Sequence, residues 1–180
     1  MIFSPLPLAG AVSIDIDPRE DARGMFARLY CDDEFAAQGL NTTWVQMNIS
    51  VNTHAGTLRG LHFQRPPADE IKLVRCLRGM ALDVILDLRR DSDTFGRHTA
   101  VTLDGARRNA IYIPKGFAHG FQTLQDGTEL QYLHSTAYAP GHEGGINPLD
   151  PALGIDWPQP PVQMSDRDRD LPPLKECDPL

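Results

Sequence analysis

Hydrophobic and polar residues alternate along most of this chain, which is the pattern of β-strands with one buried face. Residues 12–16 predict a first strand and residues 25–30 a second. From residue 44 onward, short alternating or apolar runs are separated by turn residues. They predict strands over residues 44–50, 56–64, 71–78, 81–87, 99–103, 109–113, 120–124 and 129–138. Many short strands at such intervals are typical of an antiparallel sandwich or barrel, so we expect an all-β fold.

Helical signals are confined to residues 32–38, where acidic residues fill the first turn, Asp32 is a candidate N-cap and Gly39 a stop. The segment from Asp150 is rich in Pro and Asp and predicts irregular structure that wraps over the core. A chain of 180 residues with 41% hydrophobic content is long enough for one well-packed core. We therefore expect a single domain over residues 1–180, with residues 150–180 covering it.

Composition narrows the class of protein. The formal net charge of −7 argues against nucleic-acid binding as the main function, although a local group of arginines can still meet a phosphate. No apolar run approaches the roughly 20 residues that span a bilayer, and the first residues lack the pattern of a signal peptide. We expect a cytoplasmic protein without a membrane partner. The three cysteines lack the spacing of a zinc site, so reduced thiols are expected.

The stretch Arg-Gly-Leu-His-Phe-Gln at residues 59–64 brings polar groups into a pattern that otherwise predicts a buried strand. Strict alternation places Arg59 and Leu61 on one face and Gly60 and His62 on the other. Lys72 follows closely, at the start of another predicted strand. The sequence therefore predicts that charged side chains enter the interior of the sheet.

Two segments resemble the sequence motifs of the cupin superfamily. Gly56 followed by His62 fits the start of the first motif, and Pro-Lys-Gly-Phe-Ala-His at residues 114–119 fits the second. The resemblance implies a small jelly-roll barrel, with short peripheral helices, and a pocket between its sheets. Metal-binding cupins need a second histidine where this chain has Gln64, and a neutral amide is a poor ligand for a transition metal. We therefore expect no metal.

A narrower resemblance rests on five segments in order: RGLHFQ (59–64), KLVRC (72–76), residues 87–96, IPKGFAHGF (113–121) and LGIDWP (153–158). Together they resemble the dTDP-4-dehydrorhamnose 3,5-epimerase family, with a match from about residue 21 to residue 168. The resemblance implies an isomerase that inverts the carbons on either side of the ketone in a dTDP-linked 4-keto-6-deoxyhexose. It implies no cofactor.

That chemistry needs a base over one face of the sugar, a group that stabilises the enolate oxygen and an acid on the other face. By resemblance His62 is the base, and its ordinary pKa suits proton removal near neutrality. Asp168 orients His62 from the C-terminal segment, as a carboxylate does in hydrolase triads. Lys72 is implied beside the ketone oxygen and Tyr132 on the opposite face. A shift of two residues in the match replaces Asp168 by Asp166 or Asp170.

Further residues match positions that bind the nucleotide or line the pocket: Arg23, Phe26, Gln46, Asn48, Arg59, His119 and Tyr138. A diphosphate calls for cations and a base for a flat surface, which the two arginines and the phenylalanine provide. His119 is implied as a supporting residue in the pocket. In the family the nucleotide site is completed across a homodimer by the N-terminal strands. The resemblance thus implies a homodimer in which residues 1–30 serve the neighbouring subunit.

The chain departs from the family pattern at three places: Arg28 where many members have a glutamate, residues 147–151, and Leu133-His134 after the tyrosine. We expect these departures to alter the pocket rim and the choice of sugar. Three alternatives stay open beside epimerisation at C3 and C5. They are an epimerase of C3 alone or a related ketoisomerase, a sugar-nucleotide-binding cupin without activity, and a metal-dependent cupin oxygenase.

Overall fold

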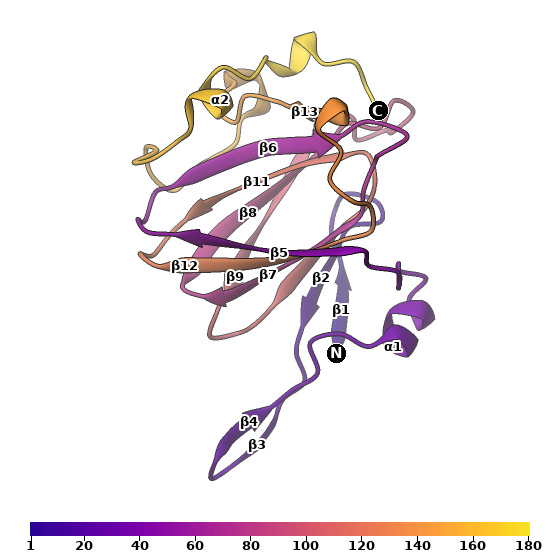
Figure 1. Cartoon of the computed structure of the whole chain (residues 1–180), viewed down its shortest axis with the longest axis vertical. Helices are drawn as coiled ribbons and strands as arrows, with labels where there is room; N and C mark the ends of the chain where they lie inside the picture. The colour runs from indigo at the N-terminus through magenta and orange to yellow at the C-terminus, as the bar shows by residue number, and fades with distance from the viewer.

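The computed structural model describes all residues from 1 to 180 and consists mainly of two facing antiparallel sheets (Figure 1). One sheet has six strands in the order β1 (Ile2–Pro5), β2 (Val12–Asp15), β10 (Ala110–Ile113), β7 (Lys72–Arg78), β12 (Thr128–His134) and β5 (Gln46–Asn52). The other has five in the order β13 (Glu143–Gly145), β6 (Leu58–Gln64), β11 (Phe117–Thr123), β8 (Met80–Asp87) and β9 (His98–Asp104). The predicted all-β jelly roll is confirmed.

The remaining elements are short. A separate hairpin joins β3 (Arg19–Asp21) to β4 (Gly24–Phe26). The helices are α1 (Asp32–Ala37) and α2 (Asp166–Arg169), and single 3-10 turns occupy Pro140–His142, Pro151–Leu153 and Leu174–Glu176. No helix is long and apolar enough to cross a membrane.

The main hydrophobic core fills the space between the two sheets. Val74 of β7 and Leu130 of β12 meet Ile85 of β8 and Phe121 of β11, and all four are almost fully buried. Removal of this apolar surface from water is the main source of stability. The inward face of β7 carries Lys72 at its first position, two residues before Val74. At that end of the barrel the apolar core therefore gives way to polar side chains.

The C-terminal segment covers the outer face of the five-stranded sheet, as its position above β6 in Figure 1 shows. Leu61 and Leu86 point to this outer side, and Trp157, Leu174 and Leu180 pack against the cluster that they form. The backbone N–H of Leu180 also donates to the carbonyl oxygen of Leu88 at 2.7 Å. This packing of the C-terminal segment places α2 beside β6.

The outer face of the six-stranded sheet is covered at one side only. Phe35 of α1 is fully buried there in a third cluster with Ile14 and Tyr112. At the other side, the edge strand β5 and the residue before it expose a row of apolar side chains that are 57–62% accessible: Val45, Met47, Ile49 and Val51. Alternate residues of one strand form this row, so they share one face.

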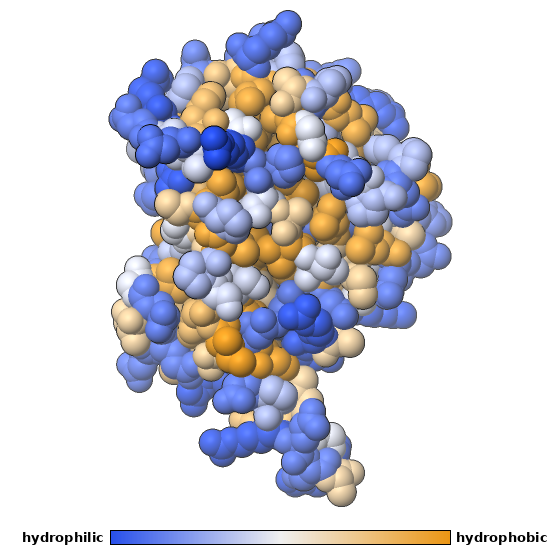
Figure 2. All heavy atoms as spheres, turned by 180° about the vertical axis from the view of Figure 1, so that it is seen from behind, coloured by the Kyte–Doolittle hydropathy of each residue, from blue (hydrophilic) through white to orange (hydrophobic).

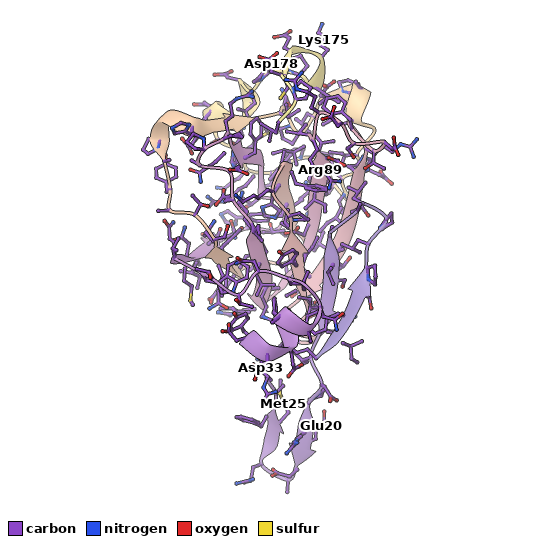
Figure 3. All side chains as sticks on the ribbon, turned by 90° about the vertical axis from the view of Figure 1, so that its right-hand side faces the viewer. Glu20, Met25, Asp33, Arg89, Lys175 and Asp178 are labelled. Carbon is purple, nitrogen blue, oxygen red and sulfur yellow. The ribbon has the colours of Figure 1, made fainter.

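The β3–β4 hairpin projects from the barrel as a narrow arm, seen with Glu20 and Met25 labelled in Figure 3. From behind, this arm is mostly hydrophilic in Figure 2. Phe26 is 79% exposed, and no residue of the hairpin is buried. An isolated two-stranded hairpin is marginally stable in water because it has no core of its own.

Most strands follow the sequence pattern, but β1, β3 and β13 were not predicted. Three further local differences concern element ends. The strand predicted over residues 25–30 ends at Phe26, because the chain then turns and the Leu29 carbonyl oxygen accepts a hydrogen bond from buried Arg75 at 2.8 Å. The strand predicted to reach residue 138 ends at His134. The N-cap of α1 is Cys31, without a side-chain cap, so the prediction of Asp32 as the cap is wrong.

Candidate active site

A cavity of about 350 Å³ lies at the polar end of the space between the sheets. β5, β7 and β12 of the six-stranded sheet and β6 and β11 of the five-stranded sheet contribute to its walls. Most of the site residues predicted from the sequence line this cavity: Gln46, Asn48, Arg59, His62, Lys72, His119, Tyr132 and Tyr138. Segments from distant parts of the sequence thus converge on one pocket.

Strand β6 turns both Arg59 and His62 into the cavity, which strict alternation forbids. Opposite β6, His119 of β11 pairs with His62 and Phe121 pairs with Arg59, so three steps along β6 match two along β11. This β-bulge reverses the direction of Arg59. The prediction that Arg59 and Leu61 share a face is therefore wrong, since Leu61 belongs to the outer cluster.

Two glycines allow the strands to meet at this bulge. Gly60 has a φ of +123°, and a Cβ added there would lie 2.5 Å from the Cα of Gly120 and 2.9 Å from the carbonyl oxygen of His119. A Cβ on Gly120 would in turn lie 2.6 Å from the carbonyl oxygen of Arg59. Any larger residue pushes the strands apart, so the backbone contact between these glycines sets the spacing beside the histidines.

His62 is bound by a carboxylate from the C-terminal segment. Its Nε2 atom lies 2.7 Å from Oδ1 of Asp168 in α2, and Oδ2 of Asp168 accepts from the N–H of Gly60 at 3.3 Å. Ser165 caps α2 by accepting from the N–H of Asp168. Burial alone raises the pKa of Asp168, but these hydrogen bonds outweigh it and hold the pKa below its ordinary value. Asp168 is therefore an ionised acceptor that orients the imidazole of His62.

A second histidine–carboxylate pair lies beside the first. Nε2 of His119 is 2.8 Å from Oδ2 of Asp83 on β8, and the side chain of Asp83 is completely buried. Burial raises the pKa of Asp83, and its Oδ1 atom has no hydrogen-bond partner. The prediction from sequence missed Asp83, although a carboxylate inside the apolar run of residues 81–87 was a signal for it.

Tyr132 lies on the wall formed by the opposite sheet. Its ring centroid is 6.0 Å from that of His119, and it stacks at 6.0 Å on the ring of His134. Burial raises the pKa of the Tyr132 hydroxyl far above its ordinary value, and the negative charge of Asp83 adds to this effect. The hydroxyl is therefore protonated at neutral pH, in the form that can give up a proton to a strong base.

Lys72 reaches the cavity from the beginning of β7. Its Nζ atom lies 3.2 Å from Oε1 of Glu70, whose other oxygen is 2.7 Å from Nδ1 of His134. Only 10% of the Lys72 side chain is exposed, so the lysine lies in the cavity wall and does not extend into solvent. In the sequence analysis, Glu70 was missed as a site residue and His134 was noted only as a departure from the family pattern.

The polar residues predicted near the nucleotide occupy one side of the cavity. Arg59 donates through Nε to Oδ1 of Asn52 at 2.9 Å and has no carboxylate partner. On β5, Gln46 Nε2 lies 3.3 Å from Oδ1 of Asn48, and Gln46 Oε1 accepts from the N–H of Tyr138 at 3.1 Å. An arginine without an acidic partner, beside amides, suits an anionic ligand.

Arg23 and Phe26 do not reach the cavity of their own chain. Both belong to the projecting hairpin, where Arg23 pairs with Asp21 at 2.6 Å and Phe26 faces solvent. The hairpin pairs only with itself and has no contact that folds it back over the barrel. Because residues 1–30 were expected to serve a neighbouring subunit, the roles of Arg23 and Phe26 stay predictions.

The side-chain amide of Gln64 binds backbone. Its oxygen accepts from the N–H of Ala139 at 2.7 Å, and its nitrogen donates to the carbonyl oxygen of Ala68 at 3.1 Å. Gln64 therefore ties together the two loops that follow β6 and β12. No three His, Cys, Asp or Glu side chains are grouped in a way that could hold a metal ion.

The other expected departures lie outside the cavity. Arg28 pairs with Glu34 at 2.5 Å near α1. Residues 147–150 bind the C-terminal segment, because Asn147 Nδ2 donates to the carbonyl oxygen of Arg169 and Asp150 Oδ2 accepts from the N–H of Leu174. Within one chain neither place lines the cavity, and their effect on the choice of sugar stays a prediction.

Comparison with known proteins adds family membership to this geometry. A family profile described as dTDP-4-dehydrorhamnose 3,5-epimerase matches residues 5–176. The chain belongs to this family. It is therefore an isomerase of the epimerase type.

Three relatives in the family illustrate the similarity. The dTDP-4-dehydrorhamnose 3,5-epimerase of Methanothermobacter thermautotrophicus is 41% identical over 97% of this chain and 95% of its own length. The dTDP-4-dehydrorhamnose 3-epimerase of Streptomyces niveus is also 41% identical, over 98% of this chain and 86% of its own. A crystal structure of a 4-keto-6-deoxy sugar epimerase from Streptomyces spheroides superposes with a TM-score of 0.93 at 41% identity. The superposition covers 98% of this chain and 88% of that chain.

Proposed function

We propose that this chain inverts C3 and C5 of a dTDP-linked 4-keto-6-deoxyhexose without a metal or a redox cofactor. The observation that carries the proposal is the placement of a histidine–aspartate pair and a tyrosine on opposite walls of one cavity. His62 comes from β6 in the five-stranded sheet, and Tyr132 comes from β12 in the six-stranded sheet. A sugar between them presents one face to a base and the other face to an acid.

The reaction begins at a C–H bond beside the ketone. His62 takes the proton as Asp168 stabilises the imidazolium, and the electron pair of the C–H bond moves into an enolate. The ammonium of Lys72 stabilises the negative enolate oxygen. Tyr132 then gives its proton to the carbon from the opposite face, which inverts that carbon. Return of a proton from His62 to the tyrosinate through solvent restores both groups. The same cycle at the second carbon beside the ketone gives the doubly inverted product.

The nucleotide lies toward Arg59, Gln46 and Asn48 in this proposal. Arg59 meets the diphosphate as an unpaired guanidinium, and the two amides bind polar groups of the nucleoside. His119, held by Asp83, supports the sugar site. On the nucleotide side of the cavity, the only aromatic residue that the same chain offers to the nucleotide base is Tyr138, which is 55% exposed.

We infer that a homodimer completes this site, with residues 1–30 of each subunit serving the other. Two features support the inference: a hairpin with no core that carries exposed Phe26 and Arg23, and the uncovered apolar row on β5. In a second copy, Phe26 would provide the flat surface for the base. The single-domain organisation and the cytoplasmic location stay predictions.

Epimerisation at C3 alone is the second candidate. The 3-epimerase of Streptomyces niveus and the 3,5-epimerase of Methanothermobacter thermautotrophicus are equally identical to this chain, so identity does not separate the two reactions. Both reactions use the same base and acid, and they differ in whether the second carbon is brought to the base.

The decisive experiment is incubation with dTDP-4-keto-6-deoxyglucose in deuterated water, followed by NMR. Deuterium at both C3 and C5 is expected. Deuterium at C3 alone would favour the 3-epimerase, and binding without any exchange would indicate a sugar-nucleotide-binding protein. His62→Asn should abolish exchange, whereas the matched variant His98→Asn on β9, outside the cavity, should exchange normally.

A further inference from the structure

A buried carboxylate on the cavity wall is shared between two basic side chains. Glu70 places Oε1 3.2 Å from Nζ of Lys72 and Oε2 2.7 Å from Nδ1 of His134. No more than 12% of any of these three side chains is exposed. A charge so far removed from water is tolerated only when its partners satisfy it, so this group behaves as one unit.

The sheet register brings these residues together. In the pairing of β12 with β7, His134 lies directly opposite Lys72, and in the pairing of β12 with β5 it lies opposite Gln46. His134 is also two residues after Tyr132, so both side chains point to the cavity and their rings stack with an interplanar angle of 13°. His134 thus borders the proposed acid Tyr132, Lys72 and the nucleotide side of the cavity.

Hydrogen bonds continue from this group across the cavity wall. His134 Nε2 lies 3.5 Å from Nδ2 of Asn48, and Asn48 Oδ1 accepts from Gln46. Since an ionised Glu70 can only accept, Nδ1 of His134 carries the hydrogen that faces it. The Asn48 amide nitrogen can only donate, so Nε2 of His134 is the acceptor. One neutral tautomer of His134 therefore satisfies both neighbours.

Glu70 is ionised in this arrangement. Burial raises its pKa, but the hydrogen bond from His134 and the attraction of Lys72 outweigh burial and lower the pKa from its ordinary value. The carboxylate fixes the position of the Lys72 ammonium, which has two further N–H donors for the cavity. If His134 did not hold the other oxygen, the carboxylate could rotate and carry the ammonium with it.

We infer that Glu70 and His134 are positioning residues, which hold the ammonium of Lys72 at the place where the enolate oxygen forms. The inference rests on the proposed function. Lys72 has a long flexible side chain, and electrostatic stabilisation of an oxyanion depends on donors that are fixed before charge develops. Glu70 and His134 supply that fixation without contact with the reacting carbons.

Two substitutions of His134 separate its hydrogen bond from its ring. His134→Phe keeps a flat ring against Tyr132 but has no donor for Glu70, whereas His134→Asn keeps a donor where Nδ1 stood and has no ring. We expect His134→Phe to lower kcat for solvent-deuterium exchange about tenfold with little change in KM, and His134→Asn to retain most of the activity. The opposite order would overturn the inference, because the ring stack would then be the important contact.

A double-mutant cycle with Lys72→Met tests whether the effect passes through the lysine. In that background His134→Phe should cost less than about twofold, since there is no ammonium left to position. An undiminished tenfold loss would show that His134 acts elsewhere and would overturn the inference. High enzyme concentration and long incubation keep the slow rates measurable. His98→Phe is the matched control, and thermal unfolding verifies that each variant folds.

Solvent-deuterium exchange measured with the wild-type protein distinguishes a failure of this inference from a failure of the proposed function. If the wild type exchanges no proton, the proposed function fails. If it exchanges normally and the His134 variants behave alike, only the positioning role fails.

Discussion

Nε2 of His62 lies 2.7 Å from Oδ1 of Asp168, although 106 positions separate the two residues in the chain. The contact exists because the C-terminal segment packs on the outer face of the five-stranded sheet and returns α2 to β6. Asp168 is 4% exposed, whereas Asp166, at the start of the same helix, has a side chain that is 94% exposed. The shift of two residues left open by the sequence is thereby resolved in favour of Asp168.

Asp168→Asn should lower kcat for deuterium exchange by about a hundredfold or more, because the neutral amide no longer stabilises the imidazolium of His62. The KM should change little, since Asp168 does not line the cavity. Steady-state exchange kinetics measured by NMR provide the comparison. Asp166→Asn is the matched control with the same chemical change on the same helix. A loss of similar size in Asp166→Asn would contradict the role of Asp168.

Tyr132→Phe should separate proton removal from inversion. His62 still removes the proton in this variant, but no acid remains on the opposite face, so His62 returns a proton or a deuteron to the face that it left. We expect deuterium to enter the substrate with its configuration retained. NMR of the recovered sugar distinguishes this result from inversion. Normal yields of the inverted product in Tyr132→Phe would assign the acid to another residue.

If a second copy covers the exposed apolar row on β5, one charge introduced into that row should dissociate the dimer. Met47 is 62% exposed in one chain, so Met47→Glu should leave the fold of that chain intact. If a second copy covers the row, the variant buries an unpaired carboxylate and becomes monomeric. Sedimentation equilibrium measures the mass, and Leu149→Glu, at an exposed loop position, is the control. A wild-type protein that sediments as a monomer would exclude the proposed exchange of hairpins.

Asp87 predicts a pH dependence of stability. Arg89 lies 2.7 Å from its carboxylate, toward the end of the molecule opposite the hairpin in Figure 3, and Ser92 and Thr94 also donate to it. Burial alone raises the pKa of Asp87, but these hydrogen bonds outweigh it and hold the pKa well below its ordinary value. Because the folded pKa is depressed, the stabilisation is fully present above about pH 4 and is lost as the pH falls toward the folded pKa.

Asp87→Asn should therefore reduce the free energy of unfolding by about 3 kcal/mol at pH 7, with a smaller deficit at about pH 3. Urea unfolding at both pH values measures the difference between variant and wild type. Asp91→Asn, at an exposed position nearby, should change stability little at either pH. A deficit in Asp87→Asn that is equal at the two pH values would indicate lost packing rather than lost charge.

The sequence by itself determined most of the strands, apart from β1, β3 and β13, and most of the pocket. Alternation predicts β-strands because one face of each strand must be buried, and the motif resemblance placed His62, Lys72 and Tyr132 in one cavity. Short-range signals were less reliable where tertiary contacts compete with them. Residues 27–30 leave the sheet because the carbonyl oxygen of Leu29 accepts a hydrogen bond from buried Arg75, and Cys31 rather than Asp32 is the N-cap of α1.

The tertiary structure alone decided which charged groups meet. The bulge at Gly60 turns Arg59 into the cavity, and no periodic rule predicts an extra residue in one strand. Asp83 and Glu70 became site residues only when strand register placed His119 and His134 beside them. Pairing of distant side chains depends on register and on the path of the tail, which result from packing of the whole chain and leave no local pattern in the sequence.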